Sequence, residues 1–317
     1  MKFSFILFAF VLLFGCFTAC HKSSDSTTPV IQDTLQAWQK IKTSETLGFS
    51  DVWFLNPARG FAAGSSAIYS SSDSGKTWSK IPGIPEGGVN LYLLNAQRGA
   101  SLGQQAIYIT DDYTNWRAKP SPASFTGLAP DIRFTSTAIC YTSGYSGLFK
   151  TTDTANTWNK IYNNPVNGMY FFDDNTGIIY DYTANAPADI YKTTDGGAHW
   201  QALGYIPGHA NSYNTMQFID PLRGWLSRGD SLFNTIDGGA TWYGQRSRGG
   251  IIYDIQFLDN KIGFLGAGEE IFKTTDGGQT WTRTCKLADE GIVEIFFLDE
   301  KTGWACGSKG SILRLKL

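Results

Sequence analysis

The chain has 317 residues, of which 42% are hydrophobic, 15% aromatic and 17% charged, and its formal net charge is −2. This composition indicates a folded body with a moderately charged surface and excludes a largely disordered chain. Basic residues form no stripe, which argues against nucleic acid as a partner. The 35 glycines and the many aromatic residues favour an all-β protein, because aromatics suit strands and glycine suits turns.

Residues 1–19 are predicted to be a signal peptide. They carry one positive charge at Lys2, then an apolar run and small residues, and they are too short to span a membrane with these flanks. The small residues before Cys20 and the polar stretch 20–33 after it resemble a bacterial lipoprotein signal and tether. The resemblance implies cleavage before Cys20 and lipid attachment to its thiol, with Cys16 as the rival site. An ordinary secretory signal is the alternative to lipidation.

The remaining cysteines are Cys140, Cys285 and Cys306. An odd number at unrelated spacings predicts neither a disulfide framework nor a zinc site, so small buried side chains are expected. The three histidines are scattered, and no glycine-rich loop leads from a strand into a helix. We therefore expect no metal and no cofactor.

An eight-residue pattern, written TTDGGQTW in its clearest copy, recurs about every forty residues. Trp116 ends a degenerate copy, and Trp38 fits the series upstream. A second pattern in the same register, such as FLDEKTGWACG from Phe297, also occurs seven times. The clear copies of the first pattern end at Trp78, Trp158, Trp200, Trp242 and Trp281.

Each repeat predicts four short strands, which we call a to d. In the sixth repeat these are YDIQFLD, GFLGA, EIFKT and TWTRT. Seven such units over residues 34–317 predict a seven-bladed β-propeller of four-stranded antiparallel blades. The last repeat stops after strand c, and the missing strand d stands near the N-terminus around Trp38. Both chain ends are therefore expected to share one blade, which removes exposed sheet edges.

The eight-residue pattern is expected to be a structural turn between strands c and d. Its Asp can accept backbone hydrogen bonds, its fifth residue needs a positive φ, and its Trp can pack between blades. Tyr113 and Ala155 replace glycine in the second and third copies, so those hairpins are expected to be the least well formed. The aspartates in question are Asp73, Asp153, Asp195, Asp237 and Asp276.

These patterns resemble the photosystem II stability/assembly-factor-like propellers and, more broadly, the Asp-box (BNR, sialidase-type) repeat proteins. The resemblance covers about residues 34–317. It implies the propeller fold and, from the photosynthetic members, a protein that holds a membrane-protein client during assembly. The early [FY]-R-I-P motif of sialidases is missing, because Asp131–Phe134 reads DIRF. The resemblance therefore favours a noncatalytic protein.

In a propeller the a–b and c–d turns share one face, and the d–a and b–c loops share the other. The variable loops lie on the second face, where binding residues are commonly placed on a rigid scaffold. Aromatic residues and arginine are favoured at protein interfaces. The alternative is that they pack on their own blades. The predicted partner-binding residues are Tyr182, Tyr205, His209, Tyr213, Arg246 and Arg248.

Acidic residues recur three positions before the strand-a Phe, at Asp51, Asp131, Asp254 and Glu294. Blades six, seven and one are neighbours, so Asp254, Glu294 and Asp51 are expected to cluster at the channel mouth. Such a cluster would bind a cation or a basic peptide, with one carboxyl pKa raised by its neighbours. The alternative is that each carboxylate caps its own loop. Arginines 59, 98 and 223 are expected as exposed turn residues on the opposite face.

Together these features predict a noncatalytic, monomeric scaffold that is lipid-anchored in the bacterial cell envelope, facing the periplasm or the cell surface. Its partner would be an envelope or membrane protein during assembly of a complex. The alternative function is an extracellular glycan-binding protein or a glycosidase of the sialidase-like propeller type.

Overall fold

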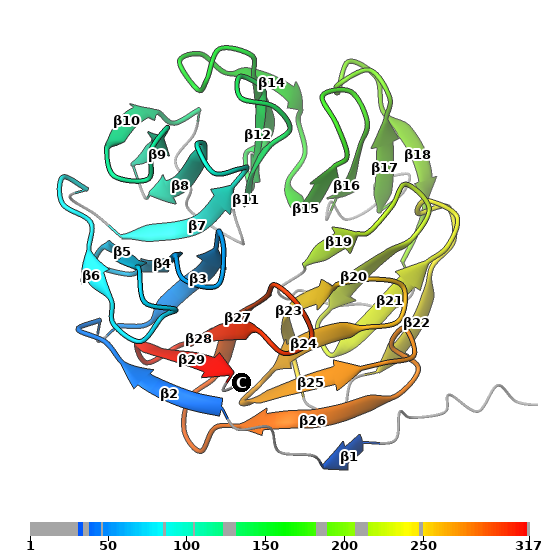
Figure 1. The fold of residues 1–317 in the computed structure, drawn as a ribbon. Coiled ribbons are helices and arrows are strands. Elements are labelled where there is room, and N and C mark those ends of the chain that lie inside the picture. The colour runs from blue at the N-terminus through cyan, green and yellow to red at the C-terminus, as the bar shows by residue number, and fades with distance from the viewer. Residues whose placement is uncertain are drawn as a thin grey trace, which may run out of the picture.

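The computed structural model describes residues 31–33, 38–45, 47–84, 87–103, 105–122, 131–181, 189–206, 215–246 and 250–315. These residues form seven sheets arranged as blades around a common centre (Figure 1). The predicted seven-bladed β-propeller of four-stranded antiparallel blades is confirmed. Within the described ranges, no helix is long and apolar enough to cross a membrane.

The blades follow one another in chain order, each beginning with its innermost strand. The strands of blades 1 to 4 are β3 Phe49–Phe54, β4 Gly60–Gly64, β5 Ile68–Ser71, β6 Ser79–Lys80, β7 Gly88–Leu93, β8 Gly99–Gly103, β9 Ala106–Thr110, β10 Trp116–Pro120, β11 Asp131–Phe134, β12 Cys140–Gly144, β13 Gly147–Thr151, β14 Asn159–Tyr162, β15 Val166–Phe171, β16 Gly177–Asp181, β17 Ile190–Thr193 and β18 Gln201–Gly204. Those of blades 5 to 7 are β19 Met216–Phe218, β20 Gly224–Arg228, β21 Ser231–Thr235, β22 Tyr243–Arg246, β23 Ile252–Phe257, β24 Gly263–Ala267, β25 Glu270–Thr274, β26 Trp281–Lys286, β27 Ile292–Phe297, β28 Gly303–Gly307 and β29 Ser311–Leu315.

Both ends of the chain complete blade 7, as predicted. Strand β2, Trp38–Lys42, pairs antiparallel with β29, and Trp38 lies opposite Leu315. A further short strand, β1 Ile31–Asp33, was not predicted, because this stretch was expected to be the end of a polar tether. It adds a fifth, parallel strand to blade 6 along β26.

Aromatic stacking between neighbouring blades explains the second repeated pattern. In four blades, the strand-a Phe of the pattern stacks on the aromatic residue of strand b in the preceding blade. Phe257 lies 3.7 Å from Trp225 between ring centroids, and Phe297 lies 3.5 Å from Phe264. The glycine of the pattern is needed because the same Phe ring covers it. A Cβ added at Gly263 would meet the ring of Phe257 at 2.5 Å.

The tryptophans of the c–d turns complete the same cores. The ring of Trp281 meets that of Phe257 edge-on at 6.0 Å, and Trp242 meets Phe218 in the same way at 6.1 Å. In blade 7 the edge-on partner of Phe297 is Trp38, at 5.9 Å, so the N-terminal strand supplies the missing aromatic residue. Such pairs add to the free energy of burying the rings.

Candidate functional site

The c–d turns are bonded by their own side chains. In the turn that ends blade 6, the Thr274 hydroxyl donates to Asp276 Oδ1 at 2.7 Å and accepts from the Gly278 N–H at 2.9 Å. Asp276 also accepts from the backbone N–H and the hydroxyl of Thr280, at 2.9 and 2.6 Å. Trp281 Nε1 donates to the Gly278 carbonyl at 3.0 Å. These polar groups therefore form hydrogen bonds with one another within the turn.

The same carboxylate bonds recur at Asp73, Asp153, Asp195 and Asp237. Donation from Thr77 lowers the pKa of Asp73 to about 2, and donation from Thr157 does the same for Asp153. Trp78 and Trp242 also donate within their turns, whereas Trp158 and Trp200 donate to Pro120 and Ile161 in the preceding blade. These contacts are those of a structural turn.

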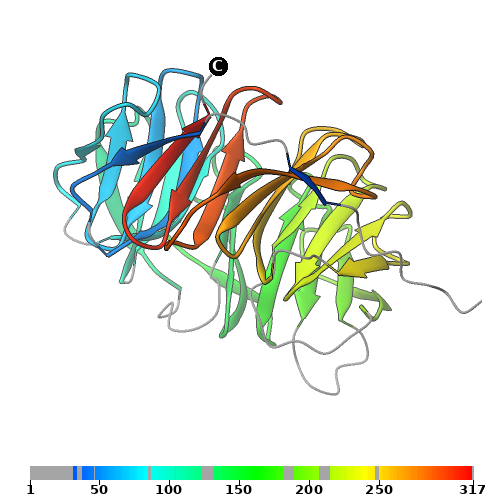
Figure 2. The same ribbon diagram turned by 90° about the horizontal axis from the view of Figure 1, so that it is seen from below.

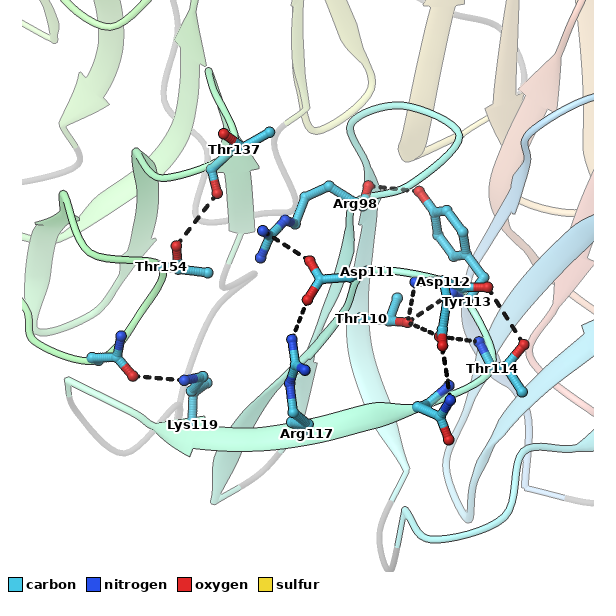
Figure 3. Close-up of polar contacts among 12 residues, drawn as sticks. Arg98, Thr110, Asp111, Asp112, Tyr113, Thr114, Arg117, Lys119, Thr137 and Thr154 are labelled. Atoms are coloured by element: carbon cyan, nitrogen blue, oxygen red, sulfur yellow. Dashed lines mark hydrogen bonds and ion pairs between the residues drawn. The ribbon is translucent and has the colours of Figure 1, made fainter.

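The turn of blade 2 is formed one residue shorter, with Asp112 in place of the expected aspartate (Figure 3). Asp112 Oδ1 accepts from the Thr110 hydroxyl at 3.1 Å and from the Asn115 N–H at 2.7 Å. Tyr113 has a φ of 56° and its hydroxyl lies 2.6 Å from the carbonyls of both Asn95 and Arg98. The buried Tyr113 anchors this turn, whereas Trp116 Nε1, unlike the tryptophans of the other turns, has no partner among the described residues.

The turn of blade 3 also keeps the full set of bonds. Ala155 N–H donates to the Thr151 hydroxyl at 3.0 Å, and Asp153 Oδ1 accepts from the Thr157 N–H at 2.9 Å. The absence of glycine appears instead as backbone strain, because Thr154 and Ala155 both have a φ of 60°. This hairpin thus keeps the bonds of its Thr and Asp side chains but has a strained backbone.

The c–d turns lie on one face of the molecule, which we call the box face. Each is held against the a–b turn of its own blade, as where the Gly277 N–H donates to the Lys261 carbonyl at 2.8 Å. The b–c and d–a loops meet on the opposite loop face, where the Ser308 N–H donates to the Gly291 carbonyl at 3.0 Å. Figure 2 shows turns gathered along two opposite sides of the blades.

The three arginines before the a–b glycines lie on the box face in different surroundings. Arg98 is paired with Asp111 at 2.8 Å and is only 14% exposed, so it is not the exposed turn residue that was expected (Figure 3). Arg223 pairs with Asp220 at 2.8 Å. Arg59 lies 5.6 Å from the Tyr113 ring and borders a cavity of about 450 Å³ between blades 1 and 2.

The acidic residues of the innermost strands converge near the propeller axis. We call Asp51, Asp131, Asp254 and Glu294 the acid ring. Near Asp51, Asp254 and Glu294 the register of strands a and b shifts by one residue, a bulge that re-aims the side chain. The charges of Asp254 and Asp131 both act on Asp51, although they belong to three different blades.

Two members of the acid ring, Asp51 and Asp254, accept hydrogen bonds from neighbouring blades. Asp51 Oδ2 accepts from the Leu91 N–H of blade 2 at 2.6 Å. Asp254 Oδ2 accepts from the Ile295 N–H of blade 7 at 3.1 Å, and its Oδ1 accepts from the Thr215 hydroxyl of blade 5 at 3.3 Å. The structure thus brings together the carboxylates that the sequence singled out, with Asp51 and Asp254 buried and Asp131 and Glu294 partly exposed. Their role in binding stays a prediction.

Burial is the main cause of the raised pKa values in this ring. It raises the pKa of Asp51 to about 8, with the charges of Asp254 and Asp131 adding to the effect and the Leu91 N–H opposing it. Burial also raises the pKa of Asp254 and of Asp131 to about 6. Burial and the charges of Asp254 and Asp51 raise the pKa of Glu294 well above its ordinary value. At neutral pH, Asp51 therefore holds a proton for most of the time.

A second layer lies two residues further along the same strands. We call it the aromatic belt: Trp53, Tyr92, Tyr170 and Phe296 together with Arg133. Trp53 lies 5.3 Å from Phe296 and 5.5 Å from Tyr92, between ring centroids. The Arg133 guanidinium lies 3.8 Å from the centroid of Tyr170. Because strand a runs towards the a–b turn, the belt lies nearer the box face than the acid ring does. The sequence analysis did not predict the belt.

Most of the predicted partner-binding residues fall outside the part of the chain that the structure describes. This holds for Tyr182, His209, Tyr213 and Arg248, and for the lipidation candidate Cys20. Tyr205 follows β18 and is 63% exposed. Arg246 ends β22, where it pairs opposite Ser231. The binding role of these residues stays a prediction.

Three buried cysteines occupy the positions that the sequence analysis assigned to small core residues. Cys140, Cys285 and Cys306 carry free, buried thiols. Among the described residues, no group of three His, Cys, Asp or Glu is spaced to hold a metal ion.

Comparisons with known proteins support the fold. Neither a protein-family model nor a curated protein matches the sequence. Among solved structures, YCF48 bound to D1 peptide matches with a TM-score of 0.71 and 17% identity over 91% of this chain and 100% of that one. The GH74 enzyme of Niastella koreensis matches with a TM-score of 0.70 and 14% identity over 88% of this chain and 53% of that one. YCF48 from Cyanidioschyzon merolae matches with a TM-score of 0.68 and 16% identity over 88% of this chain and 98% of that one. This chain is therefore a seven-bladed propeller that resembles YCF48 and GH74 propellers.

Proposed function

We propose that this protein is a noncatalytic scaffold of the bacterial envelope that holds a segment of a protein partner on its loop face. A lipid on Cys20 would keep it at the membrane, because several acyl chains anchor a protein stably. The likeness to a propeller solved with a peptide bound supports the choice of a peptide segment as ligand.

The observation that carries this proposal is the difference between the two faces. On the box face, the hydroxyls and carboxylates of the c–d turns bond to one another, as in the turn from Thr274 to Trp281. Towards the loop face lie the exposed Tyr205 and the acid ring, in which Asp51 Oδ1 has no hydrogen-bond partner among the described residues. A buried carboxyl oxygen that a partner could reach thus lies on the loop-face side.

Affinity purification from solubilised membranes tests the proposal. We expect one envelope protein to copurify with the tagged, lipidated chain and to be lost when Tyr205, Arg246 and Arg248 are changed to Ala together. The matched control changes Tyr243 and Arg223 to Ala on the box face and should keep the partner. Loss of the partner in both variants, or no partner with the unchanged protein, would contradict the loop-face assignment.

The anchor has its own test. Metabolic labelling with a radioactive fatty acid should mark the unchanged protein and the Cys16→Ser variant, whereas Cys20→Ser should be unlabelled and should leave the membrane fraction. Labelling of Cys20→Ser would reject Cys20 as the lipid site.

The glycosidase alternative has less support. A glycosidase of this kind needs two carboxylates facing each other across a cleft. The cavity between blades 1 and 2 is lined by Arg59, Lys80, Tyr113 and hydroxyl residues, and no carboxylate of the described chain lines it. Hydrolysis of a sialoside or a xyloglucan that is abolished by one carboxylate substitution would restore this alternative.

A further inference from the structure

Two buried acceptor atoms at neighbouring positions of the inner strands lack a donor. Asp51 is 3% exposed, and its Oδ1 atom has no hydrogen-bond partner among the described residues. The Oδ1 atom of Asn90, at the equivalent position in blade 2, is buried and unpartnered in the same way. Buried acceptors are normally paired, and leaving one unpaired costs free energy. A donor from outside the described chain would satisfy Asn90 Oδ1, and it would satisfy Asp51 Oδ1 once that carboxyl is ionised.

The charge around these atoms is one-sided. Within the described ranges, no lysine or arginine forms an ion pair with Asp51, Asp254 or Glu294. The charge of Arg133 acts on Asp131, but its guanidinium lies over Tyr170 and its Nε donates to the Phe171 carbonyl. Asp51, Asp254 and Glu294 therefore have no ion-pair partner among the described residues.

The oxygen atoms of the acid ring and Asn90 suit an ammonium group better than a metal ion. The described carboxylates are not spaced to hold a metal. An ammonium carries three N–H donors in different directions and one positive charge. Below the ring, Trp53 and Phe296 of the aromatic belt lie with centroids 5.3 Å apart, and a cation can also be attracted to ring faces of this kind.

We propose that the acid ring is a binding site for a lysine side chain of the partner segment, which enters from the loop face and donates to Asp51, Asn90 and Glu294. The inference rests on the proposed function, because the partner segment supplies the lysine. The loop face is the accessible direction, since the aromatic belt lies between the ring and the box face.

Proton release is the expected consequence. The ionisable groups that face the bound ammonium are Asp51, Asp254 and Glu294, with Asp131 and Arg133 from β11 and the buried Cys306 from β28. Asp51 is protonated at neutral pH in the empty ring, and a cation favours the ionised carboxylate. Binding should therefore release about one proton, so Kd should fall about tenfold per pH unit between pH 6 and 8.

The test uses the full mature protein and a blocked pentapeptide with a single central lysine. Aspartate labelled with ¹³C at the side-chain carboxyl gives NMR signals that report on Asp51 and Asp254 during titration to about 10 mM peptide. We expect both signals to shift, and calorimetry in two buffers to give about one proton released at pH 7. The same peptide with acetyl-lysine should produce no shift, because its ammonium charge is gone.

Two variants assign the effect to the ring. Asp51→Asn keeps an acceptor for the Leu91 N–H and should weaken peptide binding about tenfold or more while abolishing proton release. Glu294→Gln serves as a second test should the first variant not fold. The matched control is Asp230→Asn, which removes one negative charge from an exposed b–c turn on the same face and should leave the titration unchanged.

The outcomes separate this site from the proposed function. No shift at the highest lysine peptide concentration, or an equal shift with acetyl-lysine, would overturn the lysine site. Tighter binding of butylammonium than of the peptide would assign the ring to a free amine and reject the partner segment. If affinity purification recovers the same partner with the unchanged protein and with Asp51→Asn, the scaffold function stands and the lysine site is rejected.

Discussion

The outer hairpins and the innermost strands belong to the same blades, yet they vary to different degrees. The five turns with a clear motif repeat the same carboxylate bonds. The inner-strand position three residues before the repeated strand-a Phe (Leu in blade 2) holds five different residue types. In blade order these residues are Asp51, Asn90, Asp131, Gly168, Thr215, Asp254 and Glu294. A residue that closes a turn is fixed by that geometry, whereas a residue facing the axis need not pack and can carry charge.

The largest effect is expected from breaking the repeated packing. Phe257→Ala removes the ring that stacks on Trp225 and covers Gly263, and it leaves a cavity between blades 5 and 6. We expect a loss of about 3–5 kcal/mol in the free energy of unfolding. Chemical denaturation measures it, with the exposed Leu222→Ala as control. A loss no greater than that of Leu222→Ala would show that the stacked rings do not hold the blades together.

A smaller loss is expected from one repeated turn. Asp276→Ala removes acceptors for the Thr274 hydroxyl and for both donors of Thr280. At about 1 kcal/mol for each bond, and with water replacing part of them, we expect a loss of about 2 kcal/mol. Asp289→Ala, at an exposed position in the next loop, is the control in the same denaturation experiment. Equal effects of the two substitutions would mean that the turn's bonds add nothing to stability.

The sequence predicted what repeats and missed what depends on neighbours in space. The period of the tryptophans predicted seven blades, and the absent last strand identified Trp38 as the residue that closes the ring. Asp112 was missed because a one-residue deletion in its turn displaces the motif. The aromatic belt was missed because Trp53, Arg133 and Phe296 share no residue type, and only the fold brings them into one layer.

The spacing of the acidic residues in the sequence predicted the acid ring. The sequence did not predict that Asp51 is buried or that its Oδ1 atom lacks a hydrogen-bond donor among the described residues. The recurring acids before the strand-a Phe pointed to a cluster near the axis. Only the structure shows that Asp51 bonds to Leu91 of the next blade and leaves Oδ1 without a partner. Hydrogen bonds between blades depend on the relative placement of two strands about forty residues apart, which spacing alone does not define.

The pH dependence of stability tests the inner ring. The pKa of Asp51 is 3.8 in the unfolded chain and about 8 in the folded protein. At pH values between these two, the folded state holds a proton that the unfolded state has lost. Stability therefore falls as pH rises from about 4 to about 8, by up to about 1.4 kcal/mol per pH unit for this group. Asp51→Asn should flatten that fall while keeping an acceptor for Leu91.

Denaturation of both proteins at several pH values measures the two slopes. Asp254, Asp131 and Glu294, whose pKa values are also raised, should retain part of the fall in the variant. Identical slopes for the variant and the unchanged protein would mean that Asp51 is ionised in the folded state at neutral pH. The ring would then need a resident cation, and the proton release inferred above would not occur.

The smallest change in stability is expected from a substitution in the c–d turn of blade 3. Thr154 has a φ of 60° where the turns of blades 4 to 6 have glycine, for instance Gly277 at 76°, and the turn of blade 1 has Ser74 at 68°. Thr154→Gly should relieve the strained backbone and, after the added freedom of the unfolded chain, stabilise the protein by about 0.5–1 kcal/mol. Thr152→Gly, an exposed neighbour without a positive φ, should destabilise it instead. If both glycines destabilise the protein equally, the turn tolerates threonine without strain, and the motif's preference for glycine must have another cause.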